Sequence, residues 1–170
     1  ILTPPLPITT FSLVDTKDRS FNNNSLWGQW TFLFFGFTQC AQICPPAMAN
    51  LNKFYQLLLN KKQNPMPQIV FVSIDPEQDT PAKLANYVTS FNPHFRGVTG
   101  SQEELDKLTK NLNILYMKTQ THPQSEEYTI DHSGAILLIN PAGRLTAVFS
   151  MPHDPEQMLK EYRLIVANSG

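Results

Sequence analysis

The chain has 170 residues, a usual length for one domain and long enough to bury a full hydrophobic core. Its 13 Lys and Arg balance 14 Asp and Glu, so it lacks the basic field that a nucleic-acid backbone or an anionic membrane surface requires. The longest apolar run, residues 30–37, is far too short for a membrane-spanning helix. These features argue against nucleic-acid binding and against a membrane span within this chain.

Residues 1–10 are rich in proline and are predicted to form an extended linker. The sequence opens at Ile1 rather than Met, so we expect a signal or membrane anchor to have preceded it. Residues 11–170 are then expected to form a single domain. Its first element is predicted to be a β-hairpin extension over residues 11–21, with a turn at residues 15–18.

Two strand-to-helix units follow the hairpin. Residues 30–35 are rich in aromatic side chains and show no polar alternation, which is typical of a central strand buried on both faces. Apolar residues then recur at helical spacing over residues 45–59. A second buried strand over residues 69–74 precedes a helix over residues 81–91, which Thr80 is placed to cap.

The last part of the chain reads as helix, hairpin and helix. Ser101 and Glu104 form a capping-box pattern, and Asp154 followed by proline announces the final helix. Between them, residues 135–139 and 145–149 are predicted to form an antiparallel hairpin. This order predicts an α/β fold with a mixed central sheet and helices on both faces, where ligands tend to bind at the carboxyl ends of strands.

Cys40 and Cys44 are the two cysteines of the chain, and they lie in the loop after the first buried strand. A near-helical path would place both sulfurs on one face, where they can share a metal ion or form a disulfide. Cys44 stands at the start of the helix, where unpaired N–H groups favour a thiolate. Soft thiolates select Cu(I), and a histidine as third donor suits both Cu(I) and Cu(II).

Two other roles for the cysteines are open. They can be buried small hydrophobes, although a loop position argues against it. They can also form a structural disulfide, but so short a loop gains little stability from closure. Two cysteines and four histidines also fall short of the sets that close structural zinc sites. An open site of low coordination number is therefore expected.

The four histidines differ in their prospects as a ligand. His132 is the first choice, because it precedes a late strand in a loop that can approach the cysteine loop, although an ordinary loop histidine is an equal alternative. His94 and His122 look like solvated loop residues. His153 lies beside a helix cap and is a candidate, together with Met151, for a second copper site.

Acidic residues gather near the same predicted end of the sheet. Asp75 and Asp79 can receive a partner's positive patch or supply oxygen donors, but helix capping by Asp79 or Thr80 explains them more simply. Asp131 is a weak candidate for orienting a neighbouring imidazole.

Several ordered segments resemble the Sco/SenC copper proteins. Residues 36–45, GFTQCAQICP, resemble the cysteine signature of that family, and residues 75–81, DPEQDTP, resemble its acidic turn. Residues 131–133, DHS, and the turn at residues 140–144, NPAGR, resemble its histidine segment. Gln39 and the Ala-Gln pair after Cys40 stand where the family more usually has His and Pro-Asp.

This resemblance implies a thioredoxin-like fold, anchored outside the cytoplasm in the bacterial periplasm or the mitochondrial intermembrane space. It implies that Cys40, Cys44 and His132 hold copper. It further implies a part in assembling cytochrome c oxidase, either by delivering copper to its copper-site subunit or by reducing the cysteines there.

The leading hypothesis is a copper metallochaperone that passes the metal to cytochrome c oxidase or to another copper or thiol-exchange protein. The alternative is a thiol-disulfide oxidoreductase, in which Cys40 attacks a partner disulfide and Cys44 resolves the mixed disulfide. A thiol peroxidase is disfavoured, because Thr38 lies two residues before Cys40 and the Pro-x-x-x-Thr-x-x-Cys pattern is absent.

Overall fold

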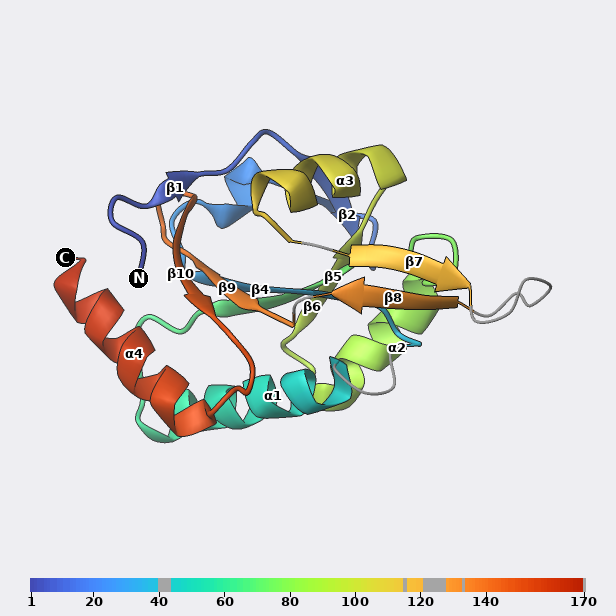
Figure 1. Cartoon of the computed structure of the whole chain (residues 1–170). Coiled ribbons are helices and arrows are strands. Elements are labelled where there is room, and N and C mark those ends of the chain that lie inside the picture. Colours follow the sequence, from blue (N-terminus) through green and yellow to red (C-terminus); the bar gives the residue numbers. More distant parts are fainter. Residues whose placement is uncertain (40–43, 115, 121–127, 133, 170) are drawn as a thin grey trace.

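The computed structural model (Figure 1) describes residues 1–39, 44–114, 116–120, 128–132 and 134–169, with the backbone alone for 116–120 and 128–132. Its strands are β1 (Leu6–Pro7), β2 (Ser12–Asp15), β3 (Ser20–Asn22), β4 (Thr31–Gly36), β5 (Gln68–Ser73), β6 (Arg96–Thr99), β7 (Tyr116–Gln120), β8 (Tyr128–His132), β9 (Ile136–Ile139) and β10 (Arg144–Phe149). Its α-helices are α1 (Cys44–Asn60), α2 (Pro81–Phe91), α3 (Gln102–Asn111) and α4 (Pro155–Asn168), and a short 3₁₀ helix covers Asn23–Leu26.

An eight-stranded sheet runs in the order β1-β10-β9-β4-β5-β6-β2-β3. Strands β4, β5 and β6 are parallel, and β9 and β10 add antiparallel neighbours on the other side of β4. Helices α1 and α4 pack together on one face, and α3 lies on the opposite face (Figure 1). The expected mixed sheet with helices on both faces is therefore confirmed.

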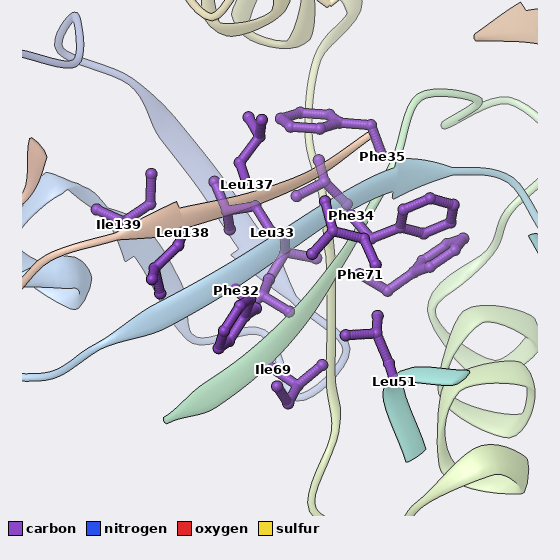
Figure 2. Close-up of a cluster of buried hydrophobic side chains, with 14 of the residues drawn as sticks. Phe32, Leu33, Phe34, Phe35, Leu51, Ile69, Phe71, Leu137, Leu138 and Ile139 are labelled. Carbon is purple, nitrogen blue, oxygen red and sulfur yellow. The ribbon is translucent and has the colours of Figure 1, made fainter. Parts of the chain in front are cut away.

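The core is centred on β4, whose six residues are all buried. The Phe32 ring meets Phe54 of α1 and Tyr162 of α4 at centroid distances of 5.0 and 5.5 Å. Figure 2 shows Leu137, Leu138 and other apolar side chains gathered around the same strand. A strand covered on both faces has no solvent side, which explains why its sequence lacks polar alternation.

The N-terminal hairpin is present, and it extends the main sheet. β2 pairs antiparallel with β3 and also with β6 at the sheet edge. Within residues 1–10, where we expected a linker, β1 pairs with β10. None of the helices in the described ranges is long and apolar enough to cross a membrane.

Two features escaped the sequence analysis. The first is β6, which has only four residues and contains Gly97, so it lacks the apolar pattern of a buried strand. The second is a separate two-stranded sheet of β7 and β8, paired from Tyr116 opposite His132 to Gln120 opposite Tyr128. Residues 121–127, which include His122, lie outside the described part of the chain.

Candidate copper and thiol site

Cys44 is the first residue of α1, and its side chain is fully buried. A Cβ atom on Gly36 would lie 2.6 Å from the Cys44 Sγ, closer than side chains approach one another. Because Gly36 is the last residue of β4, the sulfur packs directly against the carboxyl end of the central strand. The expectation that Cys44 begins the helix is met, and Gly36 is needed for this close approach.

Cys40 lies outside the described residues, but the chain leading to it is described up to Gln39. The backbone N–H of Ile74 donates to the carbonyl of Gly36, at 2.9 Å, so the end of β4 is tied to the end of β5. Thr38 is partly buried, and Gln39 is exposed. The segment that enters the cysteine loop is thus anchored up to two residues before Cys40.

The carboxylate of Asp79 anchors this segment. Its Oδ1 accepts from the Thr38 hydroxyl at 2.5 Å, and its Oδ2 accepts from the Thr38 backbone N–H at 3.1 Å. The Ser73 hydroxyl at the end of β5 also donates to Oδ2, at 2.6 Å. Asp79 is only 1% exposed, so these hydrogen bonds are shielded from water.

Capping of α2 by Asp79 is not what the structure shows. The Thr80 hydroxyl accepts from the backbone N–H of Lys83 at 3.3 Å. Of the two capping residues considered from the sequence, Asp79 and Thr80, it is therefore Thr80 that caps α2. Asp75 and Asp79 do lie at the same end of the sheet, but both are buried. The prediction that these two side chains bind a positive patch of a partner protein is therefore wrong, because neither side chain reaches the surface.

His132 is the last residue of β8, and its side chain is outside the description. Four residues later, Ile136 begins β9 and pairs with Phe34 of β4. The pairing of β9 with β4 begins at this pair, two residues before β4 ends at Gly36, against which the Cys44 sulfur packs. The chain thus leads from His132 into the sheet at the end where Cys44 is buried. In Figure 1 the arrowhead of β8 points back toward the sheet.

His153 is used by the fold. Its ring Nε2 lies 3.2 Å from the carbonyl oxygen of Phe149. Burial lowers the pKa of His153 below its usual value, although hydrogen bonding to the backbone of Phe149 and Gly134 raises it in part. A ring nitrogen that donates to a carbonyl cannot bind a metal ion, so this contact gives no support to a copper site with the exposed Met151.

Of the three expected ligands, only Cys44 has a described side chain. Cys40 and the side chain of His132 lie outside the description, as does His122. Among the side chains that are described, no three His, Cys, Asp or Glu residues gather into a metal-binding group. Asp79 is the site residue whose role the sequence analysis missed, and the resemblance of residues 75–81 to a family motif was the available signal.

Comparison with known proteins places the chain among well-defined relatives. "Protein SCO2 homolog, mitochondrial" of Mus musculus is 34% identical over 157 residues, which is 92% of this chain. The chain spans only 61% of the length of that mouse protein. Similarity to this protein therefore covers nearly all of the chain and leaves part of the longer relative unmatched.

Solved structures agree with the fold. Copper-bound ScoI of Arabidopsis thaliana has a TM-score of 0.87 at 29% identity, covering 95% of this chain and 98% of that one. Copper-bound ScoI of Bradyrhizobium japonicum has a TM-score of 0.81 at 30% identity, covering 92% and 98%. These matches confirm the thioredoxin-like fold. A family model described as SCO1/SenC matches residues 4–167, and the chain therefore belongs to the SCO1/SenC family.

Proposed function

We propose that this chain is a copper metallochaperone that holds copper through Cys40, Cys44 and His132. It would deliver copper to the copper site of cytochrome c oxidase, or prepare that site. The observation that carries the proposal is the burial of the Cys44 sulfur at the carboxyl end of β4, near which the pairing of β9 with β4 begins four residues after His132. The copper-bound state of two relatives of the same fold supports the choice of metal.

The chemistry of the donor set fits copper. Two thiolates suit Cu(I), and an imidazole as third donor suits both oxidation states. The position of Cys44 at the start of α1 favours its thiolate form through the helix dipole; Pro45 and Pro46 have no N–H, so Ala47 carries the next free N–H of this first turn. A site of three protein ligands leaves room for a partner's thiolate, so the metal can pass by ligand exchange and remains a cargo.

The proposed location and domain organisation follow from the family. We propose residues 11–170 as the working domain and residues 1–10 as the segment that leads into it, which also adds β1 to the main sheet, with a membrane anchor outside this chain. The protein would act outside the cytoplasm, in a bacterial periplasm or in the mitochondrial intermembrane space. The mitochondrial name of the mouse relative supports the second setting.

The test is a titration of the fully reduced protein with Cu(I) against a competing chelator. The wild type is expected to bind one copper ion tightly, and Cys44→Ser and His132→Ala are expected to lose that binding. His94→Ala is the matched control, because His94 is exposed and stacks on the Tyr55 ring, and it should bind as the wild type does. Unchanged binding in His132→Ala would remove histidine from the proposed site.

A thiol-disulfide oxidoreductase is the second candidate, favoured by the position of Cys44 at a helix start four residues after Cys40. The Cys40 thiolate would attack a partner disulfide, and Cys44 would displace the partner from the mixed disulfide. The products are a reduced partner dithiol and a Cys40–Cys44 disulfide. This exchange should survive His132→Ala, so the same variant separates the two functions.

A further inference from the structure

The buried carboxylate of Asp79 receives three hydrogen bonds from described residues at the entrance to the cysteine loop, and all three come from neutral donors. Two come from Thr38, which precedes Cys40 by two residues, and one comes from Ser73 at the end of β5. Among the described side chains, no cation lies within ion-pair distance of Asp79. The described partners of this carboxylate are therefore the entrance to the cysteine loop and the end of β5.

Helix capping does not account for Asp79, because Thr80 already caps α2. The backbone of Asp79 is itself fixed, since its N–H donates to the carbonyl of Asp75 at 3.0 Å in the turn after β5. The carboxylate thus connects this rigid turn to Thr38. Thr38 in turn lies two residues after Gly36, against which the Cys44 sulfur packs.

We infer that Asp79 is a positioning residue for the cysteine pair, and that its hydrogen bonds to Thr38 hold the chain before Cys40 at a set distance from Cys44. This inference rests on the proposed function, in which the two sulfurs act together. A fixed loop entrance keeps the sulfurs at a high effective concentration, which strengthens both a disulfide between them and a metal chelate formed by them.

Replacing the carboxylate by an amide should break this arrangement. A carboxylate accepts hydrogen bonds at both oxygens, whereas an amide accepts at one oxygen and presents N–H groups at the other position. In Asp79→Asn one of the Thr38 or Ser73 donors would therefore face another donor. Hydrogen bonds to a charged acceptor are also roughly twice as strong as neutral ones, so the remaining contacts would weaken.

The experiment measures two equilibria in the wild type and in Asp79→Asn. The first is the exchange of the Cys40–Cys44 dithiol with oxidised glutathione, which yields the protein disulfide and two reduced glutathione molecules. We expect the equilibrium constant to fall about tenfold in the variant, which makes the reduction potential about 30 mV more oxidising. The second is Cu(I) affinity against a chelator, which we expect to fall about tenfold as well.

Asp15→Asn is the matched control. Asp15 is a buried carboxylate on β2, two strands away from β5, and it is bonded to Arg19 and Arg96, so its loss should lower stability and leave both equilibria unchanged. Equal changes in Asp15→Asn and Asp79→Asn would overturn the inference, because they would report general destabilisation. Wild-type values in Asp79→Asn would overturn it too.

Thr38→Val provides the test if Asp79→Asn does not fold. It keeps the shape and the backbone N–H of Thr38 and removes only the hydroxyl that donates to Asp79. A smaller shift of the glutathione equilibrium in the same direction supports the inference, and no shift overturns it. If the wild type failed to bind Cu(I), the proposed chaperone function would fall, whereas the glutathione equilibrium would still decide the role of Asp79.

Discussion

Asp15 and Asp79 are both buried carboxylates, but the fold satisfies them in opposite ways. Asp15 ends β2, which lies between β6 and β3, and its Oδ2 lies 2.9 Å from Arg19 Nε and 3.0 Å from a guanidinium nitrogen of Arg96. Burial raises the pKa of Asp15, but hydrogen bonds from the backbone of Arg19 and Lys17 and from both guanidinium groups outweigh it, so the pKa lies below its ordinary value.

From the part of the chain that the structure describes, Asp79 receives only hydroxyl and backbone donors, from Thr38 and Ser73. A carboxylate paired with two arginines ties the end of β2 to β6 and to the turn before β3. A carboxylate bonded to neutral donors depends on the geometry of those donors. The difference indicates that Asp15 serves stability, whereas Asp79 serves the arrangement of the cysteine loop.

The largest expected effect on stability is at Asp15. Asp15→Ala should lower the free energy of unfolding by about 3 kcal/mol, because it removes one partner of a buried ion pair. This value is at the low end of the range for removing one partner of a buried ion pair, since both arginines can turn toward water. Urea unfolding measures it, and the glutathione equilibrium of the cysteine pair should not move. A loss well under 1 kcal/mol would mean that the arginine pairs contribute little.

Ser73→Ala tests the other carboxylate and should cost about 2 kcal/mol. The Ser73 hydroxyl donates to Asp79 and accepts from the backbone N–H of Asp75, so its removal leaves a buried donor and a buried acceptor short of partners. Urea unfolding again measures the loss. Ser90→Ala on the exposed face of α2 is the control, expected within about 0.5 kcal/mol of the wild type.

The lowered pKa of Asp15 predicts a pH dependence. The folded protein binds the proton of Asp15 less readily than the unfolded chain does, so this contribution to stability is complete above the ordinary pKa of 3.8 and is lost as pH falls through the lowered pKa. Urea unfolding of wild type and Asp15→Asn between pH 7 and pH 3 should therefore give curves that converge at the acid end. The change is smaller than that from deleting the carboxylate, and parallel curves would contradict it.

The smallest effect should come from Arg19. Its side chain is 60% exposed, so Arg19→Ala should cost about 0.5 kcal/mol, and added salt should reduce that cost further. Arg96→Ala should cost more, because Arg96 is only 26% exposed and also lies over the Phe21 ring at 5.0 Å. Equal costs would show that exposure does not separate the two ion pairs. Urea unfolding in low and high salt measures both.

Much of the fold could be predicted from local patterns. The apolar run at residues 30–35 predicted the central strand, and Thr80, Ser101 and Asp154 each predicted a helix start that the structure confirms. These signals work because burial on both faces and helix capping both depend on residues close in sequence. β6 could not be found in this way, because four residues with a glycine carry no distinct period.

The candidate site, too, has features that follow from the sequence and features that depend on tertiary packing. The spacing of Cys40 and Cys44 and the place of Cys44 at a helix start follow from the sequence, because strand, loop and helix are consecutive. The contact of Cys44 with Gly36 and the approach of the segment after His132 depend on strand packing and on the register of β9. Copper ligation by the three residues stays a prediction.

By itself, the sequence determined the central strands β4 and β5, the helices and the late hairpin, together with the family motifs and the cysteine pair, since each is written in neighbouring residues. Only the tertiary structure decided what Asp79 does. A short acidic side chain next to Thr80 has two possible partners, the N–H groups of its own helix and donors elsewhere in the fold. The parallel pairing of β4 with β5 brings Thr38, forty-one residues earlier, within hydrogen-bond distance, and so directs the carboxylate to the cysteine loop.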